Sequence, residues 1–385
     1  MNLPSALDIE KLIRIQDQSC VSIYMPTSTS GIDAKEPSIR LKNAIRKCEG
    51  QLGEQGVKPQ VISNILTPIR DLAAETRLWG QPGQQLAIFS CRDFFQYHKL
   101  PINHRQQISV GRRLYIKPLV PLLMFDRKFY ILALSLHQIK LYEVTGQGMQ
   151  EKSLKNSPQS IEDLLQYEQA EEQIQSHTTP QGKSAGSSAI FHGHGNIADK
   201  STRKKDIAEY LNAVDKGLMD LLSNEKSPLI LAGVDYIRAE YTRLSNYPNI
   251  LAEGIDGNPE QFKENQLHQA GWRIIKPLLD KEIETNIERF GDLSSSGRTS
   301  TDLHKILPAA HQGRVDTLLV EDARCIWGNF DPAKNQVHVH KEPETADEDL
   351  LNLATIKVLS GGGKVYMPSQ QQMPGRAAQA AIFRY

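Results

Sequence analysis

The feature that most constrains the fold is a long run near the middle of the chain that has no apolar periodicity. Ser176–Asn196 has the sequence SHTTPQGKSAGSSAIFHGHGN, where Gly, Ser, Thr and His stand in place of regularly spaced apolar side chains. Unstructured runs of this length inside a domain are uncommon and are usually functional or disordered. We therefore expect a flexible loop over residues 176–199, with ordered structure on both sides of it.

Length and charge limit the class of protein. A chain of 385 residues is too long for one ordinary core and predicts two to four domains. Charged residues make up 23% and hydrophobic residues 39%, which is typical of a globular protein. The 45 basic and 45 acidic residues balance, which argues against nonspecific coating of nucleic acid, and we expect no DNA partner.

Cysteine usage and hydropathy indicate a cytoplasmic, soluble protein. The four cysteines lie far apart without CxxC spacing, so we expect buried, reduced thiols and neither a disulfide framework nor a zinc site. No apolar stretch approaches the ~20 residues that span a bilayer, and we expect no membrane partner. The first residues contain no apolar block of the signal-peptide kind.

The first of three expected α/β domains covers residues 1–110. Cys20–Tyr24, Gln85–Phe89 and Asp93–His98 have the composition of strands, and Gln60–Leu78 that of a helix. A second helix is predicted over Pro37–Leu52, because apolar residues recur along it at helical spacing. Its other faces contain a basic cluster: Arg40, Lys42, Arg46 and Lys47.

The central domain is expected over residues 111–292, as a mixed sheet with flanking helices. It opens with three strand signals in a row, predicting a meander: Tyr115–Met124, Phe129–Ser135 and Gln138–Val144. After the loop, apolar residues at helical spacing predict a helix over Asp199–Leu222. These residues are Ile207, Leu211, Val214, Leu218 and Leu221. Further elements are expected in this order: strands at Ser227–Gly233 and Ile250–Ile255, then a long helix at Pro259–Glu288.

The third domain is expected over residues 302–385, after a linker at Gly291–Thr301. Helices and strands alternate along it, which predicts a small three-layer α/β unit. The glycines at Gly361–Gly363 precede a strand, so they are better explained as a helix C-cap than as a phosphate loop.

The His192-Gly-His194-Gly-Asn196 segment is the most unusual local feature. A metal site would use the His-x-His pair with a carboxylate such as Asp199, but a glycine-flanked loop fixes ligands poorly. The residues leave two other interpretations open, a solvated loop and a loop that contacts RNA. We expect no metal and no cofactor.

A second basic cluster follows the loop, at Lys200, Arg203, Lys204 and Lys205. Cations in the first turns of a helix oppose its dipole, so this placement costs some stability. A binding partner would offset that cost, while a solvated helix start remains the alternative. For Arg40–Lys47 a solvated face is the simpler interpretation.

Four stretches carry a resemblance to a known family. Residues 21–52 (VSIYMPTSTSGIDAKEPSIRLKNAIRKCEGQL), 192–222 (HGHGNIADKSTRKKDIAEYLNAVDKGLMDLL), 227–241 (SPLILAGVDYIRAEY) and 303–323 (LHKILPAAHQGRVDTLLVEDA) occur in that order. Together they resemble the archaeo-eukaryotic release factor and Pelota superfamily, most closely its bacterial branch. The resemblance implies a three-domain, release-factor-like architecture, whose third domain is similar to kink-turn-RNA-binding folds.

The resemblance also implies a site. In release factors of this kind the central loop contains Gly-Gly-Gln, which positions water at the peptidyl-tRNA ester. The matching residues here are Gly193, His194, Gly195 and Asn196, so Gly-Gly-Gln is absent. The stop-codon-reading Asn-Ile-Lys-Ser is absent too. Pelota-type factors also lack Gly-Gly-Gln and still occupy the ribosomal A site.

Three functions follow as hypotheses. The first is a tRNA-mimicking factor without release activity that binds the ribosome in rescue, hibernation or stress. Its partners would be ribosomal RNA, tRNA-site contacts and a translational GTPase. The second is a peptidyl-tRNA or ester hydrolase that acts through His194 or Asn196. The third is a protein-interaction module in stress signalling.

Overall fold

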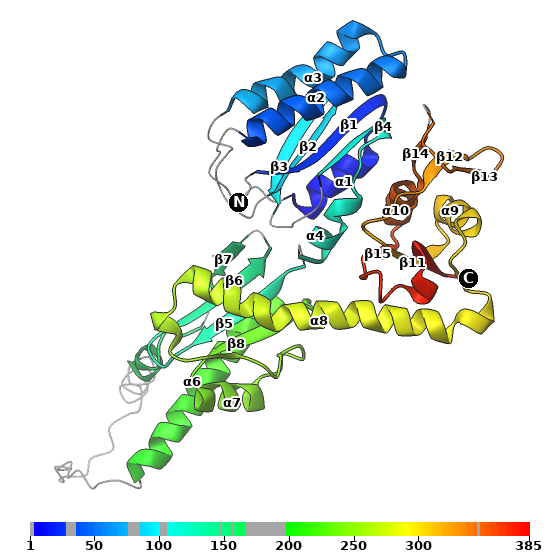
Figure 1. The fold of residues 1–385 in the computed structure, drawn as a ribbon. Coiled ribbons are helices and arrows are strands. Elements are labelled where there is room, and N and C mark those ends of the chain that lie inside the picture. The colour runs from blue at the N-terminus through cyan, green and yellow to red at the C-terminus, as the bar shows by residue number, and fades with distance from the viewer. Residues whose placement is uncertain are drawn as a thin grey trace, which may run out of the picture. The chain divides into compact units, whose positions relative to one another are not determined.

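The computed structural model describes residues 4–27, 36–75, 85–100, 106–125, 127–146, 148–155, 157–166, 198–344 and 347–385 (Figure 1). The chain forms two compact units. Unit 1 contains Met1–Asp126 and Leu279–Tyr385, and unit 2 contains Arg127–Leu278. The expected α/β class is confirmed, because helices flank several sheets. The division into domains at 1–110, 111–292 and 302–385 remains a prediction.

The N-terminal part of unit 1 is an antiparallel sheet in the order β3-β2-β1-β4. Its strands are β1 (Gln16–Pro26), β2 (Gln85–Cys91), β3 (Phe94–Leu100) and β4 (Gln107–Arg113). Two helices, α2 (Glu36–Glu54) and α3 (Pro59–Ala74), cover one face of the sheet (Figure 1). Alternate residues of β1, from Val21 to Met25, pack against the apolar stripe of α2 that the sequence predicted. The strand β4 was missed.

The opposite face of this sheet packs against α1 (Ala6–Arg14) and the segment after β4. The strand expected at Tyr115–Met124 is wrong, because this segment forms η2 (Lys117–Leu119) and α4 (Val120–Phe125). Pro118 and Pro121 explain the error: each fixes φ at a helical value and removes a backbone donor that a sheet would need. The same core includes Ile356 from the C-terminal part of the chain.

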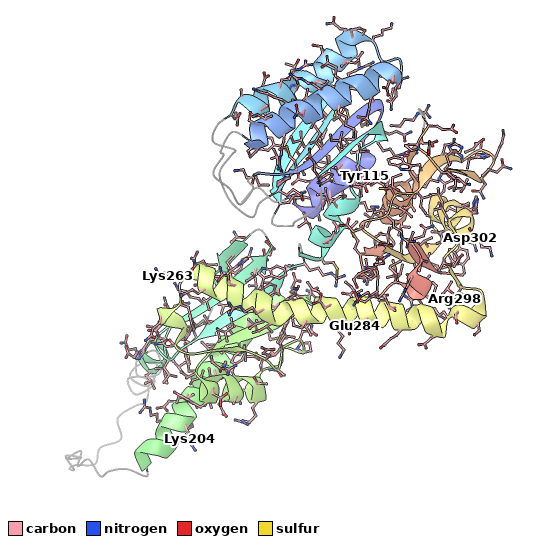
Figure 2. The ribbon with its side chains drawn as sticks, viewed as in Figure 1. Tyr115, Lys204, Lys263, Glu284, Arg298 and Asp302 are labelled. Atoms are coloured by element: carbon pink, nitrogen blue, oxygen red, sulfur yellow. The ribbon has the colours of Figure 1, made fainter. Side chains whose placement is uncertain are left out.

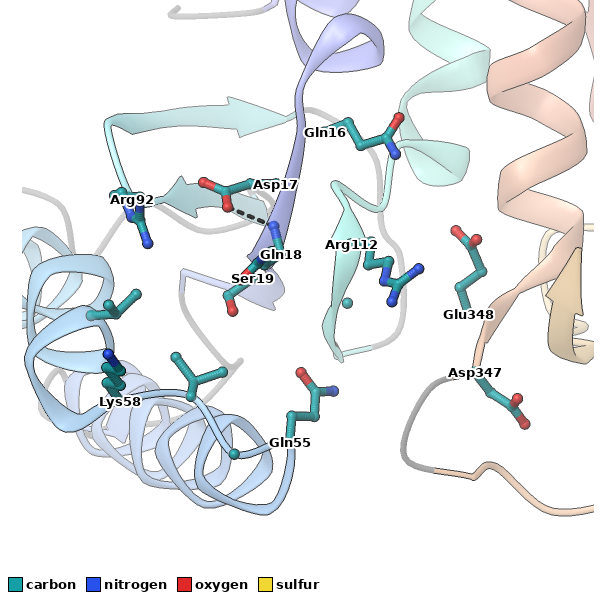
Figure 3. A pocket seen from close by; sticks show the side chains of 14 residues that line it. Gln16, Asp17, Gln18, Ser19, Gln55, Lys58, Arg92, Arg112, Asp347 and Glu348 are labelled. Atoms are coloured by element: carbon teal, nitrogen blue, oxygen red, sulfur yellow. Dashed lines mark hydrogen bonds between the residues drawn. The ribbon is translucent and has the colours of Figure 1, made fainter. Parts of the chain in front are cut away.

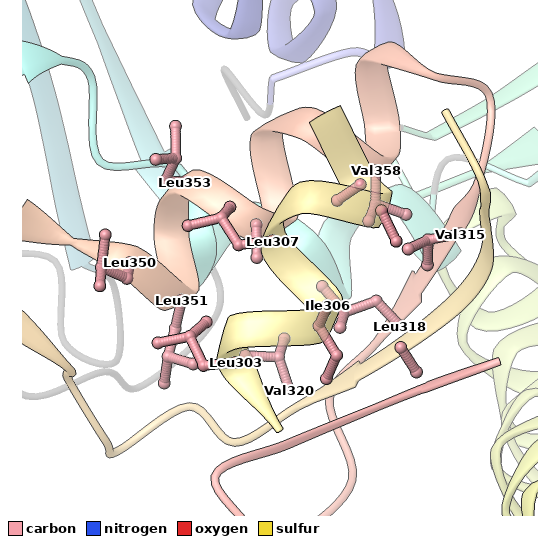
Figure 4. Packing of buried hydrophobic residues seen from close by; sticks show 14 of the residues in the cluster. Leu303, Ile306, Leu307, Val315, Leu318, Val320, Leu350, Leu351, Leu353 and Val358 are labelled. Atoms are coloured by element: carbon pink, nitrogen blue, oxygen red, sulfur yellow. The ribbon is translucent and has the colours of Figure 1, made fainter. Parts of the chain in front are cut away.

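The C-terminal part of unit 1 has three layers, as expected. Its sheet has the order β10-β16-β11-β15, with β10 (Thr299–Ser300), β11 (Val315–Val320), β15 (Lys364–Tyr366) and β16 (Gln379–Phe383). On one face lie α9 (Leu303–His311) and α10 (Leu350–Ser360), whose apolar side chains interlock with the sheet (Figure 4). The other face contacts Ile283, Ile287 and Phe290 from the long helix α8 (Glu264–Asp292).

Smaller elements complete unit 1. A second sheet has the order β13-β12-β14, from β12 (Trp327–Asp331), β13 (Gln336–His340) and β14 (Glu348–Asp349). Two short helices, η4 (Ser294–Ser296) and η5 (Pro374–Arg376), lie in connections. The expected cap after α10 is confirmed, because the Gly361 amide bonds the Lys357 carbonyl and Gly362 has a φ of +70°.

Unit 2 contains a mixed sheet in the order β7-β6-β5-β8-β9. Its strands are β5 (Phe129–Leu134), β6 (Ile139–Thr145), β7 (Gly148–Lys152), β8 (Leu229–Gly233) and β9 (Ile255–Asp256). The strands β5, β8 and β9 run parallel, whereas β5, β6 and β7 form the antiparallel meander. The strand expected at Ile250–Ile255 is reduced to an isolated bridge at Ile250 and the short β9.

Helices cover both faces of the unit 2 sheet. One face packs against α6 (Ala198–Leu222) and α7 (Asp235–Leu244). The other face packs against α8, which contacts the sheet at Gly271. In the chain, α8 comes after the short helix η3 (Pro259–Gln261). A Cβ atom at Gly271 would lie 2.9 Å from side-chain atoms of Phe129 and Ile131, so glycine allows the close approach. A mixed sheet with flanking helices is therefore confirmed.

The four cysteines are free thiols, as expected, although Cys325 is half-buried while the other three are buried. None of the helices in the described ranges is long and apolar enough to cross a membrane.

Candidate RNA-binding surfaces

The helix α6 positions one of the two predicted basic clusters. Its apolar stripe, Ile207, Leu211, Val214 and Leu218, is buried against the sheet. The expected fifth member, Leu221, is 45% exposed, and Leu222 is buried in its place. The stripe therefore shifts by one residue at the end of the helix.

Four cations precede the first of these buried residues along α6, and the structure describes the side chains of three of them. Arg203, Lys204 and Lys205 are all exposed, and we call them the α6 basic segment. Figure 2 places Lys204 toward the N-terminal end of the helix. The backbone at Lys200 belongs to α6, but the position of its side chain is outside the described structure. The α6 basic segment thus offers positive charge to solvent from the surface of a helix.

Neighbouring carboxylates neutralise this charge only in part. Lys205 lies 3.5 Å from Glu209 one helical turn away, in a pair whose side chains are 76% and 41% exposed. Such exposed pairs contribute about 0–1 kcal/mol. Arg243 donates to Glu240 on α7 and, with the charge of Lys204, holds the pKa of Glu240 below its usual range. The cations therefore stay available to an anionic partner.

The second predicted cluster lies on α2. Lys42, Arg46 and Lys47 are exposed and Arg40 is half-buried, on the faces of the helix that do not contact the sheet. This is the arrangement of an ordinary amphipathic helix, in which polar residues face water. An ion pair of 3.1 Å between Arg70 of α3 and Glu49 of α2 links the two helices. The clusters on α2 and α6 belong to different units.

The central-loop candidates Gly193, His194, Gly195 and Asn196 lie outside the described residues. Their role remains a prediction. Within the described ranges, no group of three or more His, Cys, Asp or Glu residues has the arrangement of a metal site.

Sequence reasoning missed a buried polar cluster in unit 1. Lys117 is completely buried, and its Nζ lies 3.3 Å from Oδ2 of Asp349. Lys117 Nζ also donates to the Arg324 carbonyl. The signal was present, because Lys117 interrupts the apolar run from Leu114 to Val120. A lone lysine in such a run predicts a buried cation with a partner.

Most of unit 2 matches a known protein-family model. Residues 129–277 match the model for bacterial archaeo-eukaryotic release factor family 7. The match begins at the first residue of β5 and ends just before the last residue of unit 2. Residues 129–277, about two fifths of the chain, are therefore similar to this family. The resemblance expected from the sequence is thereby confirmed, and the α6 basic segment lies inside the release-factor-family region.

Several solved structures align along nearly the whole chain at low similarity. Archaeal translation termination factor aRF1 is 14% identical, with 99% of this chain and 97% of that one covered and a TM-score of 0.25. Archaeoglobus fulgidus Pelota is also 14% identical, with 100% and 93% covered and a TM-score of 0.34. S. cerevisiae Dom34, described as a translation termination-like factor that interacts with Hbs1, is 10% identical, with 100% and 94% covered and a TM-score of 0.38. Scores below 0.5 establish no common arrangement of the whole chain. Curated protein sequences gave no match.

Proposed function

We propose that this protein is a translation-associated factor that binds the ribosome in the manner of a tRNA and does not release peptide. The observation that carries the proposal is the α6 basic segment within the region that matches the release-factor family. Exposed Lys and Arg side chains are groups that contact RNA phosphates. The exposed cations of α2 would add a second contact.

The proposal assigns rescue or hibernation of ribosomes, under stress, as the physiological setting. Dom34 is described as interacting with Hbs1. Another of the solved structures is a model of ribosome-bound archaeal Pelota and ABCE1. By analogy, we propose that a translational GTPase delivers or removes this factor.

Sedimentation of the protein from cell extract through a sucrose gradient tests ribosome binding. We expect the protein to migrate with ribosomes, and to leave those fractions when RNase destroys the particles. A protein that stays at the top of the gradient in low salt would favour the interaction module in stress signalling.

The hydrolase remains the second candidate, because Gly195-Asn196 keeps a glycine followed by an amide. Asparagine is one methylene shorter than glutamine, and His194 places a side chain where the family has glycine. Loss of one positioning group costs on the order of 10²-fold or more in rate. We expect no peptide release from ribosomes loaded with peptidyl-tRNA, and unchanged ribosome binding for Asn196→Ala.

The converse variant sharpens this test. If the geometry alone prevents release, His194→Gly combined with Asn196→Gln should gain measurable activity. Release by the unmodified protein, abolished by Asn196→Ala or His194→Ala, would make it a hydrolase.

A further inference from the structure

Unit 1 contains a groove of about 960 Å³ that the release-factor relationship does not explain (Figure 3). Its walls come from four places: the start of β1, the turn between α2 and α3, the ends of β2 and β4, and β14. Ligand pockets commonly measure ~300–1,000 Å³, so the groove has room for a molecule of nucleotide size.

Three cations line the groove from separate elements: Lys58, Arg92 and Arg112. All three side chains are exposed. None of them makes an ion pair or a side-chain hydrogen bond with another residue that the structure describes. In Figure 3, Lys58 and Arg92 lie on one side of the groove and Arg112 on the other.

Two of the three carboxylates that line the groove already have partners. Both oxygens of Glu348 accept hydrogen bonds from Arg113, at 2.7 and 2.9 Å. Asp347 contacts Nδ1 of His340 at 2.8 Å and accepts from the Glu344 amide at 3.0 Å. Only Asp17 lacks a cationic partner among the described residues, and it accepts from the Gln18 amide. The groove therefore has more uncompensated positive than negative charge.

We propose that this groove binds a nucleoside di- or triphosphate. Its phosphates would contact Lys58 and Arg92, since ammonium and guanidinium groups are the usual phosphate donors. Val57 and Val61 supply a half-buried apolar surface for the base, and Gln16 and Gln55 supply amides. The groove's volume of about 960 Å³ suits a small ligand better than the continuous backbone of an RNA strand.

Calorimetric titration of the purified full chain with AMP, ADP and ATP tests the proposal. We expect saturable binding whose affinity rises with the number of phosphates. Lys58→Gln combined with Arg92→Gln should weaken ATP binding at least about tenfold. It should also reduce the differences in affinity among AMP, ADP and ATP. A thermal shift by ATP should disappear in the same variant.

The matched control removes two exposed cations of unit 1 outside the groove, as Lys281→Gln with Lys305→Gln, and should bind ATP normally. No saturable binding of any nucleotide would overturn the proposal, as would equal ATP affinity in both variants. Binding of an RNA oligonucleotide without binding of ATP would also overturn it. Ribosomes are absent from these measurements, so their outcome is independent of the proposed function.

Discussion

One lysine of unit 1 and two lysines of unit 2 lie in opposite environments. In unit 1, Lys117 is completely buried beside Asp349, whose side chain is 2% exposed. In unit 2, Lys204 and Lys205 are exposed on α6, and the side chain of Glu209, the partner of Lys205, is 41% exposed. A buried ammonium group is tolerated only with a partner, whereas an exposed one contributes little to folding and can bind a ligand. We therefore expect the buried charge to affect the free energy of unfolding and the exposed charges to affect ribosome binding.

The buried charge in unit 1 belongs to a larger polar cluster. Asn352 of α10 accepts hydrogen bonds from the amides of Ile116 and Lys117, at 2.9 and 3.1 Å, and donates to the Leu114 carbonyl at 3.2 Å. Asp349 also caps α10 by accepting from the Leu351 amide. These bonds join segments more than 200 residues apart in the sequence, and they make the N-terminal and C-terminal parts of unit 1 depend on each other.

The largest expected effect follows from breaking this cluster. Asp349→Ala leaves the Lys117 ammonium buried without its charged partner, which typically costs about 3–5 kcal/mol. Urea unfolding of the variant should show this loss in the free energy of unfolding. As a control, Glu49→Gln breaks the exposed pair with Arg70 and should cost about 1 kcal/mol or less. Equal losses in the two variants would contradict the distinction between buried and exposed charge.

Unit 2 also buries a carboxylate, and this residue tests whether a paired cation sets the cost of removing a buried charge. Asp215 of α6 is 3% exposed and accepts hydrogen bonds from Tyr241, Ser245 and Asn246. Its partners are neutral, so Asp215→Ala leaves donors unsatisfied but no unpaired cation. We expect a loss of about 2–3 kcal/mol in the free energy of unfolding.

The exposed Asp220 lies on the same helix and provides the control, with Asp220→Ala expected within about 0.5 kcal/mol of the parent. A loss for Asp215→Ala larger than that for Asp349→Ala would show that pairing with a cation is not what sets the cost.

Two histidines of unit 1 predict a smaller, pH-dependent effect. The hydrogen bond with Asp347, and the charges of Asp347 and Glu344, raise the pKa of His340. Stability from this contact is present below the unfolded pKa of ~6.5 and is lost as pH rises through the folded pKa. Desolvation and the Lys357 ammonium lower the pKa of His311. The contribution of His311 to stability therefore has the opposite sign: it increases as the pH rises toward the unfolded pKa of ~6.5.

Unfolding midpoints measured from pH 5 to pH 8.5 should separate the two histidines. His340→Asn should lower the unfolding midpoint more at pH 5 than at pH 8.5. His311→Asn should remove the part of the midpoint's increase with pH that comes from His311. Parallel curves for the parent and His340→Asn would show that the contact with Asp347 does not form in solution.

Local pattern predicted most of the fold. The stripes of α2 and α6 and the meander of β5 and β6 follow from apolar spacing alone. The prediction failed at Tyr115–Met124, where apolar composition indicated a strand and two prolines imposed helical backbone. Local pattern can indicate that Lys117 is buried, but it cannot identify the partner Asp349, which is remote in the sequence. The exposed cations of α2 and α6 were predicted because helical spacing alone determines which faces turn outward.

The groove could not be predicted in this way. It forms where Lys58, Arg92 and Arg112 meet from elements that are separate in the sequence. No motif links these residues, since their proximity comes from the antiparallel order of β1, β2 and β4 and from the turn that joins α2 to α3.

The most direct test of the account is the salt dependence of ribosome binding by two charge-matched variants of unit 2. Lys204→Gln with Lys205→Gln removes two charges of the α6 basic segment. Lys216→Gln with Lys226→Gln removes two exposed charges, one in the second half of the same helix and one four residues after its end. Co-sedimentation with purified ribosomes at several salt concentrations gives the log–log slope for each. The account predicts weaker binding and a slope smaller by roughly 0.7–0.9 per lost contact for the first variant alone, with both variants as stable as the parent. Identical affinities and slopes for the two variants would contradict it.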